Sequence, residues 1–185
     1  MIRSTPCNFH LHIGRARQYL SDAACQTAIQ SLVLSRMDYC CSLLGNIPQA
    51  QVHKLQLVQK RAARLITRAS PRDHIKLILA RLHWLPVHMR IQFRILVHTY
   101  KCLHASSPPY ISDMISRYAP TRQLRSSNDI TLLNTRRTAK SVGRGDFRFM
   151  APFLWNELPR HIRERPSVVT FKRHLKAFYY SQYFN

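Results

Sequence analysis

The stretch PQAQVHKLQLVQKRAARLITRASPR, residues 48–72, decides how this chain folds, and it contains neither Gly nor any acidic residue. At about 100° per residue on a helix, its apolar residues fall on one face. These are Val52, Leu55, Val58, Ala62, Leu65 and Ile66. The basic residues Lys54, Lys60, Arg61, Arg64 and Arg68 fall on the other face. The spacing predicts an amphipathic helix over 48–69, begun by Pro48, with a positively charged outer face.

Helical periodicity continues on both sides of this stretch. The spacing of apolar residues predicts further helices over 22–44, 73–83, 86–103, 109–118 and 167–183. Ser21 and Asp73 are expected as N-caps, and Gly45 with Pro48 is expected to end the first helix. From 121 to 148 the pattern becomes polar and basic, and the runs 130–133 and 146–150 predict a small β-hairpin.

The expected fold is therefore mainly α. We predict a helical bundle over residues 1–118 and a basic C-terminal segment over 119–185, which holds a short hairpin or irregular stretch and terminal helices. That segment is expected to contain a compact apolar cluster made of Phe147, Phe149, Phe153, Leu154, Trp155 and Leu158. We expect every Phe, together with Trp84 and Trp155, to be buried.

Positive charge is the strongest functional signal in the sequence. The 185 residues contain 29 Lys and Arg against 8 Asp and Glu, a formal net charge of +21, and most of the cations are Arg. Arg presents a planar fork of donors that matches phosphate oxygens. A solvated helix face usually mixes both signs, so this imbalance indicates a polyanionic partner, above all a nucleic acid. An acidic protein or a membrane surface stays open as an alternative.

The basic side chains of 48–69 and of the Arg-rich stretch are the candidate nucleic-acid-binding residues. The set is Lys54, Lys60, Arg61, Arg64, Arg68, Arg122, Arg125, Arg136, Arg137, Lys140 and Arg144. Aromatic rings near such cations can stack on unpaired bases. The candidates for stacking are Tyr110, Tyr118, Tyr179, Tyr180 and Tyr183.

Catalytic chemistry is poorly represented. No two of the eight acidic residues are separated by one to three residues, as the acids of a two-metal polymerase or nuclease site often are. The local pairs Cys7/His10 and Cys102/His104 are a weak zinc signal, and there is no Gly-rich phosphate loop. We therefore expect no enzymatic activity, no metal, no cofactor and no small-molecule substrate.

The location of the protein is predicted from its cysteines and its apolar runs. Five Cys residues at irregular spacing do not form a disulfide framework, which indicates a reducing compartment, either nuclear or cytoplasmic. No run of about 18 apolar residues exists, so we expect no membrane partner. Residues 1–20 are Arg-rich and contain no acid, as in a transit peptide, but they run directly into a helical pattern.

Several segments together resemble the C-terminal region of jockey-like non-LTR (LINE-type) retrotransposon reverse transcriptases. They are FHLHIGRARQYLS (9–21), LSRMDYCCSLL (34–44), KLQLVQKRAARLIT (54–67), LHWLPV (82–87), PPYISD (108–113), LRSS (124–127) and APFLWNELP (151–159). Their order and spacing hold over nearly the whole chain. The resemblance implies a thumb-like region followed by a post-thumb segment.

In that family the catalytic palm and the endonuclease lie upstream of the matching region, so the resemblance implies no polymerase activity here. It implies that the chain binds RNA or an RNA–DNA hybrid through the backbone of the nucleic acid. The cations of residues 54–68 are suited to such contacts. It also implies the palm and fingers of a reverse transcriptase as a partner. We expect a non-catalytic nucleic-acid-binding fragment. The alternatives are a non-functional truncated relic and, less in keeping with the scattered acids, a chain with polymerase or nuclease activity of its own.

Overall fold

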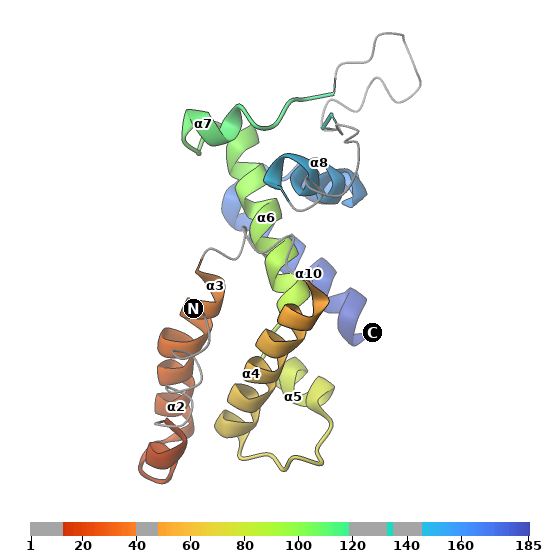
Figure 1. Cartoon of the computed structure of the whole chain (residues 1–185). Helices are drawn as coiled ribbons and strands as arrows, with labels where there is room; N and C mark the ends of the chain where they lie inside the picture. The colour runs from red at the N-terminus through yellow and green to blue at the C-terminus, as the bar shows by residue number, and fades with distance from the viewer. Residues whose placement is uncertain (1–12, 40–47, 119–132, 135–145) are drawn as a thin grey trace. The chain divides into compact units, whose positions relative to one another are not determined.

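The computed structural model describes residues 13–39, 48–118, 133–134 and 146–185. This part of the chain is mainly helical, which confirms the expected fold class (Figure 1). It forms two compact units. Unit 1 contains residues 13–39 and 48–90 together with Tyr183–Asn185, and unit 2 contains the described residues of Ile91–Gln182. The boundary expected near residue 118 thus lies inside unit 2.

Unit 1 is built from short helices around one long helix. Its elements are η1 (Arg17–Tyr19), α2 (Asp22–Ile29), the π-helical turn η2 (Gln30–Leu34), α3 (Ser35–Asp38), α4 (Gln49–Thr67), α5 (Ile75–Arg81) and the start of α6 (Val87–Leu103). Ser21 is the N-cap of α2, as predicted, and its side chain accepts from the amide of Ala24. The predicted helix over 48–69 is confirmed as α4.

One predicted cap is wrong. His74 occupies the N-cap position of α5, and the side chain of Asp73 instead accepts from the amide of Ser70 at 2.6 Å. The carboxylate thus closes the turn between α4 and α5, because Asp side chains bond readily to nearby backbone amides outside helices. In the core of this unit, α2 packs against α4 with Cys25, Ile29 and Ile66 buried.

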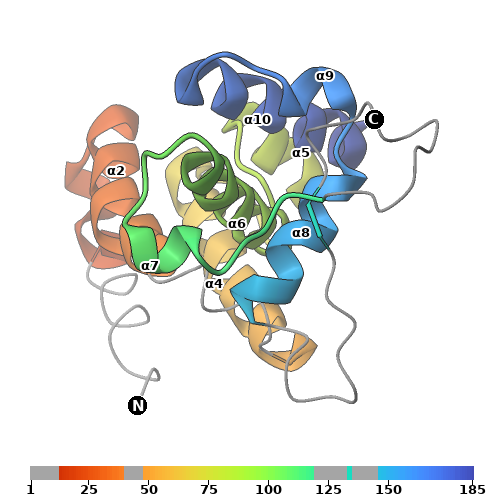
Figure 2. The same ribbon diagram turned by 90° about the horizontal axis from the view of Figure 1, so that it is seen from above.

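Unit 2 contains the rest of α6 with α7 (Pro109–Ser112), α8 (Phe147–Glu157), α9 (Arg160–Arg163) and most of α10 (Val168–Phe184); Figure 2 gives a second view of these elements. Three buried aromatic rings join α6, α8 and α10. Tyr100 stacks on Phe171 at 4.5 Å between centroids, and Trp155 lies 5.7 Å from Phe171. The Tyr100 hydroxyl donates to the carbonyl of Arg165 at 2.6 Å, which satisfies the polar end of a buried ring.

The predicted β-hairpin is wrong over 146–150. Asp146 is the N-cap of α8, where its side chain accepts from the amide of Arg148, and the run 147–150 is helical. The spacing of the buried residues Ala151, Leu154, Trp155 and Leu158 is helical and outweighs the short alternating run. Residues 130–132 lie outside the described part of the chain.

Leu133 nevertheless makes two strand-like hydrogen bonds. Its amide donates to Asn156 Oδ1 and its carbonyl accepts from Asn156 Nδ2, each at 2.9 Å. Leu133 also forms an isolated antiparallel bridge with Arg117. An amide side chain on α8 thus takes the place of a second strand for this residue, which satisfies the backbone groups of a fully buried leucine.

The aromatic cluster gives a direct test of what holds unit 2 together. Replacing Phe171, which has no exposed surface, with Ala should destabilise the fold by about 3–5 kcal/mol, because a large ring is removed from a packed site. The matched control is Phe153→Ala. Phe153 is 56% exposed, against our expectation that every Phe is buried, and its loss should shift stability by less than about 0.5 kcal/mol. Urea unfolding would measure both, and equal effects would contradict the packing described.

Candidate nucleic-acid interface

The long helix α4 has one buried and one basic face. Its buried residues are Gln59, Ala62, Ala63 and Ile66, which span an arc of about 100°. Val58 and Leu65, predicted on the apolar face, are only half-buried, because they lie about 40° and 60° outside that arc. The five basic side chains spread over about 120° on the opposite side. The helix therefore carries its charges away from the core of unit 1, as the sequence predicts.

A pair of glutamines fixes the buried face of α4. Gln59 Nε2 donates to the carbonyl of Leu85 at 2.8 Å, and Gln59 Oε1 accepts from Gln56 Nε2 at 2.8 Å. Gln56 Oε1 in turn accepts from the amide of Val87 at 2.9 Å. This relay satisfies backbone groups on both sides of Pro86, including the first amide of α6, which has no partner within its own helix. The chain reversal at 85–87 is thereby attached to α4.

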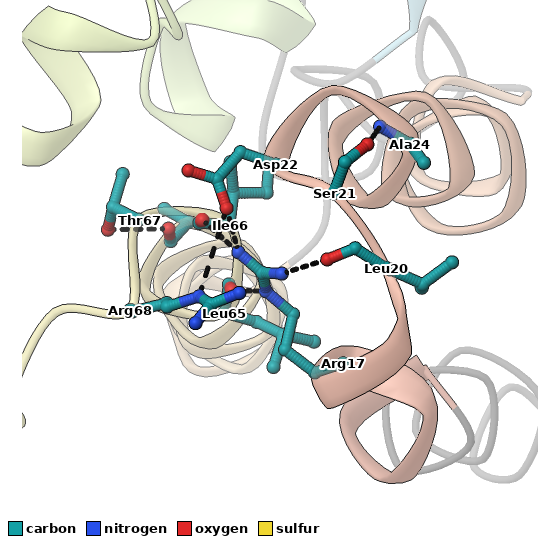
Figure 3. A network of polar contacts seen from close by, with 10 residues as sticks. Arg17, Leu20, Ser21, Asp22, Ala24, Leu65, Ile66, Thr67 and Arg68 are labelled. Atoms are coloured by element: carbon teal, nitrogen blue, oxygen red, sulfur yellow. Dashed lines mark hydrogen bonds and ion pairs between the residues drawn. The ribbon is translucent and has the colours of Figure 1, made fainter.

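The C-terminal end of α4 is held by Arg17 (Figure 3). Arg17 Nε donates to the carbonyl of Leu65 at 2.8 Å, and Nη2 donates to the carbonyl of Ile66 at 3.0 Å. These carbonyls belong to the last turn of α4, where no amide of the helix reaches them. A cation also interacts favourably with the negative end of the helix dipole. Arg17 is buried, with 7% of its surface exposed, so it is a structural cation.

The remaining donors of Arg17 connect α4 to the start of α2. Nη1 donates to the carbonyl of Leu20 at 2.7 Å, and Nη2 also bonds and pairs with the carboxylate of Asp22. This hydrogen bond from Arg17 is the main reason that the pKa of Asp22 is lowered, and the charges of Arg17, Arg68 and Arg81 add to the effect. The sequence pattern did not reveal this role, because nothing local distinguishes Arg17 from the exposed Arg15.

Two of the predicted binding residues, Arg64 and Arg68, make contacts within the protein at the same C-terminal end of α4. Arg64 donates from Nε to the carbonyl of Ser70 and from Nη2 to those of Pro71 and Asp73, each at 3.3 Å. Arg68 ends α4 with a left-handed backbone, φ 53°, and its Nε lies 3.8 Å from Asp22 Oδ1. Arg64 therefore holds the loop that follows α4 by hydrogen bonds, and the carboxylate of Asp22 partly compensates the charge of Arg68.

Lys54, Lys60 and Arg61 make up the rest of the basic face. Lys54 and Arg61 are exposed, and Lys60 is half-buried. Lys54 and Arg61 are seven residues apart, so they lie nearly in line on the helix, about 10 Å apart along its axis. The nearest acids in the sequence on either side are Asp38 and Asp73. We call these three residues the α4 stripe.

A cation outside α4 also makes a structural contact. Arg90 bonds bidentately to Asp38, with Nη2 at 2.7 and 2.6 Å from the two carboxylate oxygens. Both side chains are largely buried, so this pair joins α3 to the first turn of α6. The predicted binding residues Arg122, Arg125, Arg136, Arg137, Lys140 and Arg144 lie outside the described residues.

The tyrosines predicted to stack on bases differ in exposure. Tyr179 is buried, and burial, with a smaller contribution from Glu157, raises the pKa of its hydroxyl, so the prediction for Tyr179 is wrong. Tyr183 packs against His88 at 6.4 Å and lies beneath Lys76. Tyr110 is 67% exposed and Tyr118 is 37% exposed, so both rings are accessible.

Metal-binding clusters and membrane-spanning helices are both absent from the described residues. Within them, no three His, Cys, Asp or Glu side chains are grouped so that they could hold a metal ion. In the same part of the chain, no helix has the length and apolar character needed to cross a bilayer. Cys25 and Cys102 are free thiols and buried, and burial raises the pKa of Cys25.

The role of Arg17 can be tested by removing its guanidinium while keeping its apolar stem. Arg17→Met should destabilise the protein by about 3 kcal/mol, because the carbonyls of Leu65 and Ile66 lose their donors at a buried helix end. Arg15→Met is the control, since Arg15 is exposed two residues earlier, and it should change stability by less than about 0.5 kcal/mol. Urea midpoints for the two variants would measure the difference, and similar midpoints would refute the structural role.

Acid sensitivity tests the other end of the same network. Because the pKa of Asp22 is lowered in the folded protein, its contribution to stability is complete above the unfolded value of about 3.9 and is lost as pH falls through the folded value. Between pH 5 and pH 3, the Tm of the wild type should therefore fall more steeply than that of Asp22→Asn. Asp113→Asn, at the exposed end of α7, is the control and should follow the wild type.

No protein-family model matches this sequence, and no curated protein or solved structure matches it significantly. The function proposed next therefore rests on the charges and contacts of the chain itself, together with the resemblance carried by its motifs.

Proposed function

We propose that the protein is a non-catalytic nucleic-acid-binding chain that grips the backbone of RNA or of an RNA–DNA hybrid. The α4 stripe of Lys54, Lys60 and Arg61 is the main contact. The resemblance to the thumb and post-thumb region of jockey-like reverse transcriptases supports this proposal. In that setting the palm and fingers of a reverse transcriptase would be the protein partner.

The observation that carries the proposal is that the cations of α4 differ in the contacts they make within the protein. Arg64 and Arg68 are engaged by backbone carbonyls and by Asp22. The α4 stripe lies on the same helix, opposite a buried face that the Gln56–Gln59 relay holds in place. Because α4 is held along its buried face and at its C-terminal end, its cations lose little conformational entropy when they bind a ligand. Such a preordered row of cations favours a polyanion whose charges are regularly spaced.

The spacing of the stripe fits a nucleic-acid strand. Lys54 and Arg61 are about 10 Å apart along the helix, and successive phosphates rise by about 3.4 Å along one strand of a duplex. The stripe therefore spans about three phosphate steps. Such contacts go to phosphates, so they position the strand and do not read its sequence. A flat anionic membrane would present no such repeat, which is why we favour nucleic acid.

Neutralising the stripe tests the proposal. The triple variant Lys54→Gln, Lys60→Gln and Arg61→Gln should weaken binding of a 20-base-pair RNA–DNA hybrid equally for unrelated sequences. It should also reduce the slope of log K against log salt by about one for each residue replaced. Each phosphate contact that is lost lowers the number of counterions released on binding. Fluorescence anisotropy over a range of salt concentrations would measure both. Arg64 and Arg68 are left intact so that binding is not confused with folding.

The control variant removes the same number of charges elsewhere. Arg15, Arg72 and Arg148 are exposed and lie off α4, so their joint replacement with Gln should leave at least the greater part of the affinity. If this control weakens binding as much as the α4 variant, the interaction is general surface charge and the proposal fails. A parallel measurement with phosphatidylserine vesicles tests the membrane alternative, and preferential binding to vesicles would also overturn the proposal.

A second candidate is a chain that serves only as a structural fragment and needs a partner to cover its apolar surface. Leu77, Phe153 and Val169 are 69%, 56% and 73% exposed, which favours this alternative. It predicts binding of a hydrophobic dye and the absence of a cooperative thermal transition for the chain alone. A cooperative transition with little dye binding would exclude it.

A further inference from the structure

Three aromatic rings of unit 2 form a stacked column. The imidazole of His104 stacks on Tyr100, with 4.1 Å between the ring centroids and 25° between the ring planes. Tyr100 stacks in turn on Phe171 of α10, at 4.5 Å and 24°. Two rings this close to Tyr100 would overlap if they shared one of its faces, so they cover opposite faces. The order is therefore Phe171, Tyr100 and His104, and we call these three rings the His104 column.

The His104 column runs from the core of unit 2 to its surface. Phe171 and Tyr100 are buried, whereas His104 is exposed. Because Tyr100 covers one face of the imidazole, the exposed surface of His104 belongs to its other face and to its edges. A further flat ring placed on that face would extend the column by one member. Offset stacking of this kind is a favourable arrangement for aromatic rings.

The end of α6 holds the backbone of His104 in place. The amide of His104 donates to the carbonyl of Tyr100 at 3.2 Å, and the amide of Ser106 donates to the carbonyl of Lys101 at 2.9 Å. Ala105, between them, has a left-handed backbone with φ 53°. This is the hydrogen-bonding pattern of a Schellman motif, which closes a helix with a left-handed residue. An ordered helix end therefore presents the imidazole, and a ligand that binds there loses less affinity to ordering of the protein.

A cation lies beside the outer ring of the His104 column. Nη2 of Arg117 donates to the carbonyl of Leu103, the residue before His104, at 3.2 Å. Arg117 is exposed, and its backbone forms the antiparallel bridge with Leu133. Partial burial lowers the pKa of the His104 imidazole, and the charge of Arg117 lowers it further, so the ring is neutral near pH 7. The site thus combines an uncharged flat ring with a guanidinium that can bind an anion.

We propose that the exposed face of His104 stacks an unpaired nucleobase and that Arg117 contacts a phosphate of the same strand. This inference rests on the proposed function, since it assigns a second contact with the same class of ligand. It deepens that function, because the α4 stripe contacts only the backbone, whereas a base must be unpaired to lie on an imidazole. The ligand of the His104 column is therefore a single-stranded segment.

The charge of the chain favours a nucleobase over an aromatic side chain of another protein. The net charge is +21, and Arg117 lies beside the ring, so an aromatic group that is linked to phosphates fits the surroundings of His104 best. Every base has a flat face, so stacking of this kind tolerates any sequence. The His104 column should therefore distinguish single strands from duplexes and not one sequence from another.

Truncation of the outer ring tests the site in the full chain. His104→Ala should weaken binding of a labelled single-stranded oligoadenylate about five- to tenfold, because the stacked base loses its partner. The slope of log K against log salt should stay the same, since no phosphate contact is lost. Arg117→Gln should instead reduce that slope by about 0.7, the value for one phosphate contact with a single strand. Fluorescence anisotropy over a range of salt concentrations measures both quantities.

Two control variants separate stacking from other effects. His104→Phe keeps a flat ring at the end of the column and should retain the affinity for the single strand. His161→Ala removes another exposed histidine of unit 2, from α9, and should bind like the wild type. Thermal unfolding of each variant shows whether a loss of affinity comes from a loss of folding.

A second readout follows the base itself. A strand that carries a fluorescent purine analogue, whose emission falls when its ring stacks, should be quenched by the wild type and by His104→Phe, and much less by His104→Ala. Full affinity of His104→Ala for the single strand, or equal quenching by all three proteins, would overturn the stacking site.

The RNA–DNA hybrid separates this inference from the proposed function. Because all bases of a blunt hybrid are paired, His104→Ala should bind it like the wild type. If the wild type binds the hybrid but not the single strand, the stacking site fails and the α4 stripe remains. If the wild type binds neither, the proposed function fails as well.

Discussion

The guanidinium of Arg17 at the end of α4 is the interaction on which the rest of unit 1 depends. It supplies donors to two carbonyls of the last turn of α4, to the carbonyl of Leu20, and to the carboxylate of Asp22. One side chain thus fixes the end of the basic helix and the start of α2, although Leu65 and Ile66 lie 48 and 49 residues from Arg17 in the sequence. Without it, buried carbonyls would lose their partners at the place where the helix dipole is most negative.

This arrangement explains how so basic a chain can fold with eight acids. Backbone carbonyls accept hydrogen bonds from Arg17 and Arg64, and their dipoles stabilise the two guanidinium charges without neutralising them. Asp22 interacts with both Arg17 and Arg68, and Asp38 binds Arg90 through both of its oxygens. Asp22 and Asp38 therefore pair with arginines that are buried or that join helices. No acid lies in the sequence between Asp38 and Asp73, so α4 itself carries no acid that could offset the α4 stripe.

The sequence predicted those features that depend on periodicity. The bounds of α4 and α10 follow from apolar spacing over four or more turns, and Ser21 follows from the local chemistry of a cap. The prediction from sequence failed where contacts between residues far apart in the chain determine the structure. Gln59 is a polar residue in the centre of the buried face, and only the distant carbonyl of Leu85 makes that position favourable. Arg68, the C-cap of α4, and His83, two residues after the end of α5, both have a positive φ of 53°, where a pattern search expects glycine.

The candidate site was predicted as a set of charges, and those of α4 differ in the structure in what their side chains contact. Arg61 and Arg64 are indistinguishable in sequence, yet only Arg64 reaches the loop after α4. A surface of like charges weakens the compact state through self-repulsion. A polyanion that binds only the folded chain must then stabilise it by mass action, so folding and nucleic-acid binding would be thermodynamically coupled in a protein with this distribution of charge.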